Sequence, residues 1–296
     1  MKLSTTIGFF SEKRYSAEYG VDICVKAGFD ALDFAFHSSS KFSDADSVTE
    51  KGKEWFKNLR KRAEDNGLVF NQAHVPFPSS VTDPDKTEEI FQNIVRCFSS
   101  AEILGISNVI VHPKHHLLYW EEGVPEKLFD MNMEFFNRLL PYAKDHGIVI
   151  CTENMYSGRA ASGESYYDHA SCSTASESVR YIDTINDEHF KYCLDIGHAI
   201  LCREEPVTFI RTLGKERLKA LHIHDVNGVS DMHTLPYYGG AGRWESVCKA
   251  LKEIGYTGDF TYEGNNFMHW LPEELLLPAL KYAVEIGRYL ISRIEG

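Results

Sequence analysis

The chain has 296 residues, of which 43% are hydrophobic and 25% are charged, an ordinary composition for a globular protein. Its formal net charge of −12 argues against a broad surface for nucleic acids or anionic membranes, because phosphate groups are bound by clustered Lys and Arg. The length suits either one α/β barrel or two smaller domains.

Short runs of β-branched and aromatic residues alternate with longer amphipathic runs along the chain. The short runs predict eight strands, at residues 3–9, 31–36, 69–75, 108–112, 148–154, 192–197, 218–224 and 260–264. Helical patterns lie between them, as at residues 86–105 and 126–147, and several end in Gly, which is typical of a helix C-terminus.

Eight successive βα units predict a parallel sheet that closes into a single (β/α)8 TIM barrel. No Pro- or Ser-rich linker divides the sequence, so we expect one domain over residues 1–296. An open doubly wound sheet is the alternative architecture. The loops after the second, fourth, fifth and seventh predicted strands are long, as expected where the C-terminal face of a barrel carries the function.

The seven cysteines are an odd number and include no Cys-x-x-Cys pair, which indicates a reducing compartment. The first residues contain no apolar run long enough for a signal peptide, and no run along the chain is long enough to span a membrane. We therefore expect a cytoplasmic protein with no membrane partner, and the acidic charge makes nucleic acid a poor candidate partner as well.

Six consecutive predicted strands end in a His, Asp or Glu. These residues are His74, His112, Glu153, Asp195 with the nearby His198, His222 with His224, and Glu263. In a closed barrel such strand ends converge on one pocket. Each residue alone could be an ordinary hydrogen-bonded core residue, but several carboxylates buried together require a counter-charge. The nearby loops supply only Lys114, Arg159 and Arg243, so we predict a divalent cation.

Several of these segments together resemble the xylose isomerase-like TIM barrels, which include sugar isomerases, ketose 3-epimerases and type IV apurinic endonucleases. They are TEN (152–154), CLDIGHA (193–199), LHIHD (221–225), the pair Asp231 and His233, and YTGDFTYEG (256–264). The resemblance covers essentially the whole chain. It implies a metal held by Glu153, Asp195, His222 and Glu263. It also implies a homo-oligomer, either a dimer or a tetramer.

By the same resemblance, Glu153 and Glu263 also act as the acid/base pair and His198 contacts the substrate. Further candidates for substrate contact near the rim are His74, His112, Arg159 and Arg243. Three carboxylates and one imidazole form a hard ligand set, so Mn²⁺ is the predicted metal, with Mg²⁺, Co²⁺ and Zn²⁺ as alternatives. Within the LHIHD segment, we expect His222 to bind the metal, Asp225 to orient it and His224 to point away.

The activity that this implies is isomerisation or epimerisation of a small sugar, sugar phosphate or polyol by proton transfer next to a carbonyl. A dehydratase or lyase that acts on a keto-sugar or an inosose begins with the same step and remains open. Two positions depart from the ketose 3-epimerase pattern, since Arg159 replaces a Glu and Gly228 replaces an Arg. Arg159 is therefore a candidate for an anionic substrate group, or else a solvated loop residue.

The rival function is a trinuclear-zinc phosphodiesterase that resembles the apurinic endonucleases. That family's nine ligand positions correspond to His74, His112, Glu153, Asp195, His198, His222, Asp231, His233 and Glu263. Asp231 and His233 are therefore candidates for an additional metal. A binding protein that keeps the pocket without turnover is a third interpretation, which the intact set of proposed ligands disfavours.

Overall fold

The computed structural model describes residues 1–296 except 13–14, 37–48 and 159–166. Within the described chain, eight parallel strands form one sheet, and each overlaps a strand predicted from the sequence. They are β1 (Leu3–Thr6), β2 (Ala31–Ala35), β3 (Val69–His74), β4 (Asn108–Val111), β5 (Val149–Glu153), β8 (Phe190–Asp195), β9 (Leu218–His222) and β10 (Phe260–Tyr262).

The strand order is β10-β1-β2-β3-β4-β5-β8-β9, so neighbours in the chain are neighbours in the sheet. The two outer strands of this order meet just beyond β9. There the Ile223 amide donates to the carbonyl of Thr261 at 2.8 Å, and the Glu263 amide donates to the carbonyl of Ile223 at 3.1 Å. These bonds close the ring. The predicted (β/α)8 barrel is therefore confirmed, and an open doubly wound sheet is excluded.

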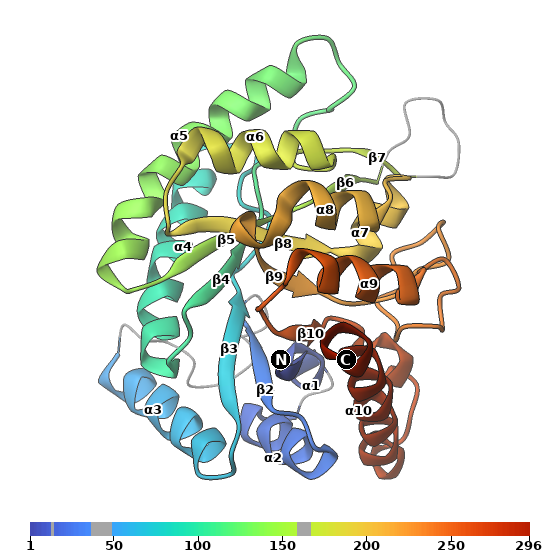
Figure 1. Cartoon of the computed structure of the whole chain (residues 1–296). Coiled ribbons are helices and arrows are strands. Elements are labelled where there is room, and N and C mark those ends of the chain that lie inside the picture. The colour runs from blue at the N-terminus through green and yellow to red at the C-terminus, as the bar shows by residue number, and fades with distance from the viewer. Residues whose placement is uncertain (13–14, 37–48, 159–166) are drawn as a thin grey trace.

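The main helices surround the barrel (Figure 1). They are α2 (Ala17–Ala27), α3 (Glu50–Glu64), α4 (Pro84–Leu104), α5 (Val124–Asp145), α6 (Ala175–Ile185), α8 (Pro206–Arg217), α9 (Trp244–Ile254) and α10 (Glu273–Glu295). Their ends follow the sequence signals. For example, Asp83 accepts from the first amides of α4, and Gly105 ends that helix at a φ of 78°. No helix among the described residues is long and apolar enough to cross a membrane.

Among the described residues, three short helices and one hairpin lie close to the strand ends. The helices are α1 (Gly8–Glu12), α7 (Ile196–Leu201) and the 3₁₀ helix η2 (Asn265–Met268), and the hairpin pairs β6 (Tyr156–Ser157) with β7 (Asp168–His169). The sequence did not predict the hairpin, which lies in the long segment after β5. The two chain ends lie side by side (Figure 1), since the amino group of Met1 pairs with Glu295.

Apolar side chains fill the space between the strands and the helices, and large aromatic residues such as Phe34, Phe136 and Phe190 are fully buried there. All seven cysteines are free thiols. Inside the barrel, by contrast, hydrogen-bonded polar side chains lie below the strand ends, including Asp33, Gln72 and Thr261. This polar layer is the floor on which the site is built.

Candidate functional site

Four proposed metal ligands converge at the C-terminal ends of the strands. Glu153, Asp195 and His222 are the last residues of β5, β8 and β9, and Glu263 directly follows β10. The first three are fully buried, whereas Glu263 is partly exposed. One ligand atom from each of the four lies within 4.8 Å of the others. The parallel sheet therefore brings together residues that are up to 110 positions apart in sequence.

His222 lies at the centre of this group. Its Nδ1 atom is 2.8 Å from Oε1 of Glu153, 3.2 Å from Oε2 of Glu263 and 4.0 Å from Oδ2 of Asp195. One imidazole nitrogen thus faces three carboxylates. That arrangement matches a hard cation site better than a structural ion pair, because one imidazole cannot neutralise three carboxylates.

A second group shares Glu153 with the first. The Nε2 atom of His112 lies 3.1 Å from Oε2 of Glu153, and Nε2 of His74 lies 3.7 Å from the same oxygen. The two imidazoles contact each other through their Nε2 atoms at 2.9 Å. The structure thus places the imidazoles of His74 and His112 next to the carboxylate of Glu153.

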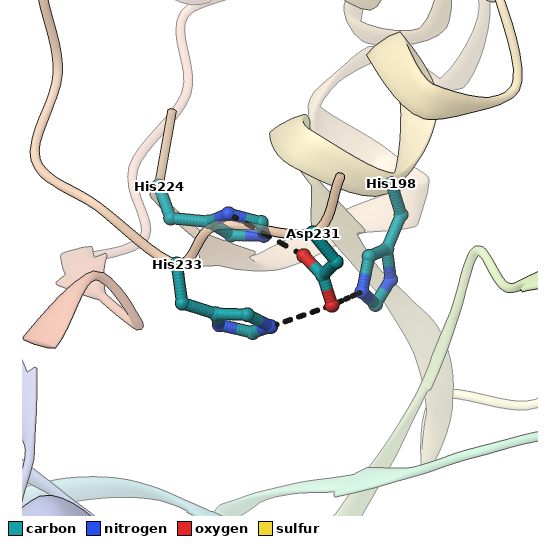
Figure 2. A group of neighbouring side chains, drawn as sticks. All are labelled: His198, His224, Asp231 and His233. Carbon is teal, nitrogen blue, oxygen red and sulfur yellow. Dashed lines mark hydrogen bonds and ion pairs between the residues drawn. The ribbon is translucent and has the colours of Figure 1, made fainter. Parts of the chain in front are cut away.

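Figure 2 shows a third group, in which the carboxylate of Asp231 lies between His198 and His233. The Nε2 atom of His233 is 2.9 Å from Oδ2 of Asp231, and that of His198 is 3.8 Å from the same oxygen. His198 reaches the group because Asp195 caps α7 by accepting from the His198 amide at 2.6 Å. The backbone of His233 has a φ of 43°, a strained conformation for a non-glycine residue that is common at functional sites.

The expectation that His224 points away from the site is wrong. Residues two apart in an extended chain face the same side, and Nε2 of His224 lies 2.9 Å from both carboxylate oxygens of Asp195. Its ring stacks on that of His233, with 4.2 Å between the ring centroids. Gly197 leaves the room for it, since a Cβ there would lie 2.0 Å from Cε1 of His224. His224 therefore links the first group to the third.

Asp225 does not orient His222 as expected. Its carboxylate accepts from the amides of Gly240 and Gly242 and from Nε1 of Trp244, at 2.9 to 3.2 Å. Asp225 therefore organises the long loop before α9. The second ring nitrogen of His222, Nε2, faces a different carboxylate, that of Asp33, at 3.6 Å.

The charged groups of the site shift one another's pKa values. Burial opposes ionisation of Glu153, but His222, His112 and His74 hold its pKa well below the usual range. Burial opposes protonation of His198, yet Asp195, Asp231 and Glu153 raise its pKa to about 10. Burial and the neighbouring His74 instead lower the pKa of His112 to about 3. The buried carboxylates and imidazoles of the site thus strongly shift one another's pKa values.

Buried polar atoms without a hydrogen-bond partner are concentrated at these groups. Within the described chain they include Oε2 of Glu153, Nε2 of His222, Nδ1 of His224 and Oδ1 of Asp231. Buried polar atoms are nearly always paired, because an unpaired one costs about 1–3 kcal/mol. Oε2 of Glu153 belongs to the second group, and Nδ1 of His224 and Oδ1 of Asp231 belong to the third, whereas Nε2 of His222 faces Asp33. The carboxylate and imidazole donors of these groups are suited to the divalent cation predicted from the sequence.

A cavity of about 620 Å³ opens above the groups. The residues of the three groups that line it are Glu153, Glu263, His198, His74, His112, Asp231 and His233, so a small molecule in the cavity can contact the site. His115, His116, Phe77 and Tyr156 also line it and were not predicted to do so. The first two were missed because a loop residue between strand and helix carries no periodic signal.

Of the two candidate arginines, the structure describes only Arg243. Arg243 is exposed at the residue before α9, where the chain returns to the outer layer, and is not among the described lining residues. The proposed contact of Arg243 with a substrate is therefore not supported. Arg159 lies outside the described residues. Asp33 was also missed, although a lone carboxylate within the apolar run ALDFAF is a visible signal.

Known proteins share both the sequence family and the fold of this chain. Residues 21–282 match the family described as xylose isomerase-like TIM barrel. The chain belongs to this family. It is 24% identical over 258 residues to D-psicose 3-epimerase of Agrobacterium fabrum, covering 83% of this chain and 79% of the relative.

Solved structures show the same fold at low identity. A D-tagatose 3-epimerase-like protein superimposes with a TM-score of 0.75 at 22% identity, covering 99% of this chain and 98% of the other. The IOLI protein, solved with a bound zinc atom, superimposes with a TM-score of 0.73 at 15% identity, covering 99% and 98%. At these identities the structural likeness establishes the barrel rather than the reaction.

Proposed function

We propose that this protein is a divalent-metal-dependent isomerase or epimerase of a small sugar or sugar-like polyol, which acts by proton transfer next to a carbonyl. The observation that carries the proposal is the group of Glu153, Asp195, His222 and Glu263, whose ligand atoms lie within 4.8 Å of one another beneath an open cavity. The named sugar epimerase among the relatives supports the same reaction class.

Each residue of the group has a role in this scheme. A bound divalent ion would polarise the substrate carbonyl and acidify the adjacent carbon-bound proton. Glu153 and Glu263 come from β5 and from the end of β10, so they approach the cavity from different strands. One carboxylate removes the proton and the other returns a proton to the opposite face of the carbon. His198, His74 and His112 line the cavity, where they can hydrogen-bond substrate hydroxyls.

Three carboxylates and one imidazole favour Mn²⁺, with Mg²⁺, Co²⁺ and Zn²⁺ as alternatives. Asp231 and His233, together with His198 and His224, form a second ligand group that is suited to an additional ion. No Lys or Arg is among the described residues that line the cavity. This supports an uncharged sugar, and a phosphorylated substrate would need a cation from the residues that the structure does not describe, such as Arg159.

A second candidate function is a trinuclear-zinc phosphodiesterase that resembles the apurinic endonucleases. The observation that favours it is the assembly of all nine corresponding positions into three adjacent groups, two of which share Glu153. The net charge of −12 argues against it, because DNA binding requires clustered basic residues. The proposal also includes a homo-oligomeric state, which rests on the family resemblance, and a cytoplasmic location, which rests on the sequence.

Metal analysis of the purified protein, followed by assay of the stripped and reloaded forms, tests the proposal. We expect one or two Mn²⁺, Mg²⁺ or Co²⁺ ions per chain and conversion of a ketose or keto-polyol only by the reloaded form. About three zinc ions per chain with cleavage of DNA at abasic sites would favour the phosphodiesterase instead. A product lighter by one water would identify a dehydratase on the same site.

A further inference from the structure

We propose that Asp33 is a positioning residue that holds the imidazole of His222 with its Nδ1 atom turned toward the metal group. The inference rests on the proposed function, because it assumes that His222 binds a metal. Asp33 lies in β2, on the far side of the ring from the other three ligands. Its Oδ2 atom is 3.6 Å from Nε2 of His222, whereas Nδ1 faces Glu153, Asp195 and Glu263.

The two facing groups are both buried and incompletely paired. His222 and Asp33 are 0% and 1% exposed. Nε2 of His222 and Oδ1 of Asp33 have no hydrogen-bond partner among the described residues. An approach of a few tenths of an ångström would bring the 3.6 Å separation of Nε2 and Oδ2 close to hydrogen-bond length, at about 3.2 Å or less. In that arrangement Nε2 carries the proton and donates to the carboxylate, which leaves the Nδ1 lone pair for the metal.

The polar layer of the barrel fixes the carboxylate itself. Nε2 of Gln72 donates to Oδ2 of Asp33 at 3.1 Å, and Oε1 of Gln72 accepts from Oγ1 of Thr261 at 3.2 Å. Asn71 donates in turn to the hydroxyl oxygen of Thr261. A chain of side chains from β3 and β10 thus holds Asp33 in place. Asp33 is therefore well suited to determine which way the His222 ring faces.

The affinity for Co²⁺ tests this role. Asp33→Leu removes the acceptor and keeps a side chain of similar size, although it leaves Nε2 of Gln72 without this partner. Its dissociation constant for Co²⁺ should rise by about 10–100-fold, as for other lost carboxylate partners of metal-bound histidine. The visible absorption band of bound Co²⁺ should also shift. Asp33→Asn keeps an acceptor oxygen without the charge, so its affinity should lie between those of the wild type and Asp33→Leu.

Ser100→Ala is the control, because Ser100 is a buried polar residue of α4 whose hydroxyl bonds to the carbonyl of Arg96 and lies outside the chain of side chains that holds Asp33. We expect its Co²⁺ affinity to stay within about twofold of the wild type. A purely structural Asp33 would change the thermal midpoint without changing the dissociation constant or the Co²⁺ band, and that result would overturn the inference. If Asp33→Leu does not fold, unchanged affinity in Asp33→Asn would overturn it equally.

The wild-type titration separates this inference from the proposed function. A wild-type protein that binds no Co²⁺ would overturn the proposed function and the inference with it. Normal binding by the wild type and by both Asp33 variants would overturn the role of Asp33 alone.

Discussion

The Nδ1 atom of His222 lies 2.8 Å from Oε1 of Glu153, which joins the ends of β9 and β5 across the floor of the cavity. Glu153 also takes part in the second group through Oε2, which lies 3.1 Å from His112. A single buried carboxylate thus connects two sets of imidazoles.

His222→Ala should abolish metal binding at the first group, since it removes the only described nitrogen that faces the three carboxylates. His224→Ala should weaken binding by a smaller factor, about 10–100-fold, because it removes the partner of both Asp195 oxygens rather than a ligand of the first group. Equilibrium titration with Mn²⁺ measures both. Equal losses in the two variants would show that the two histidines have equivalent roles.

Gly197→Ala should distort the site, because the added Cβ would lie 2.0 Å from Cε1 of His224. Overpacking of this kind costs about 1–3 kcal/mol of unfolding free energy, and we expect a loss of metal affinity as well. Removing the ring should relieve the clash, so the double variant Gly197→Ala/His224→Ala should be no less stable than His224→Ala alone. Denaturant unfolding of the four proteins measures the coupling. Simple additivity of the two changes would contradict the predicted clash.

Glu177, in the first turn of α6, predicts a pH dependence of stability that is independent of the metal groups. Burial raises its pKa to about 7, while Tyr119 donates to its carboxylate at 3.0 Å. A carboxyl whose pKa is higher in the folded state stabilises the fold at low pH, and this contribution is lost as the pH rises toward the folded-state pKa. Glu177→Gln should therefore raise the unfolding free energy by about 1–3 kcal/mol near pH 8 and change it little near pH 4.5.

Denaturant unfolding at the two pH values measures this difference. The exposed Glu188 offers a matched control, since Glu188→Gln makes the same change of charge on the surface. It should show no comparable gain at the higher pH. Equal effects of Glu177→Gln at both pH values would contradict the prediction.

Much of the fold follows from local sequence signals. The apolar strand runs, the glycines after helices such as Gly105, and the His, Asp and Glu residues at strand ends are all local features, and the closed barrel makes those ends converge. The direction of a side chain beyond a strand end, by contrast, depends on neighbours from other strands. His224 faces Asp195 because Gly197 leaves space for its ring, and that space becomes visible only once β8 and β9 are paired.

The sequence marks Asp33 as an unusual carboxylate within an apolar run, but it does not show which ligand Asp33 contacts. The role expected for Asp225 was inferred from its nearness in sequence to His222, yet the carboxylate nearest to Nε2 of His222 is that of Asp33, from another strand. Asp225 instead binds amides of its own loop. Nearness in sequence is therefore a poor guide to which carboxylate supports a metal-binding histidine.

Glu263→Gln should separate metal binding from proton transfer. The amide keeps an oxygen that can face the metal group but cannot readily accept or return a proton. We expect partial retention of metal and a fall in kcat of at least about 10²-fold, the usual size of an acid–base contribution. Steady-state kinetics with parallel metal analysis tests it. Full activity in this variant would rule out Glu263 as one of the two bases.

The incorporation of deuterium during turnover in heavy water tests the central claim most directly. The metal-loaded protein should release product that carries deuterium at the carbon next to the carbonyl, because Glu153 and Glu263 exchange protons with solvent between removal and return. Nuclear magnetic resonance of the product locates the label. Product formed at the full rate with no deuterium at that carbon would contradict the two-carboxylate mechanism and indicate direct transfer of hydrogen within the substrate.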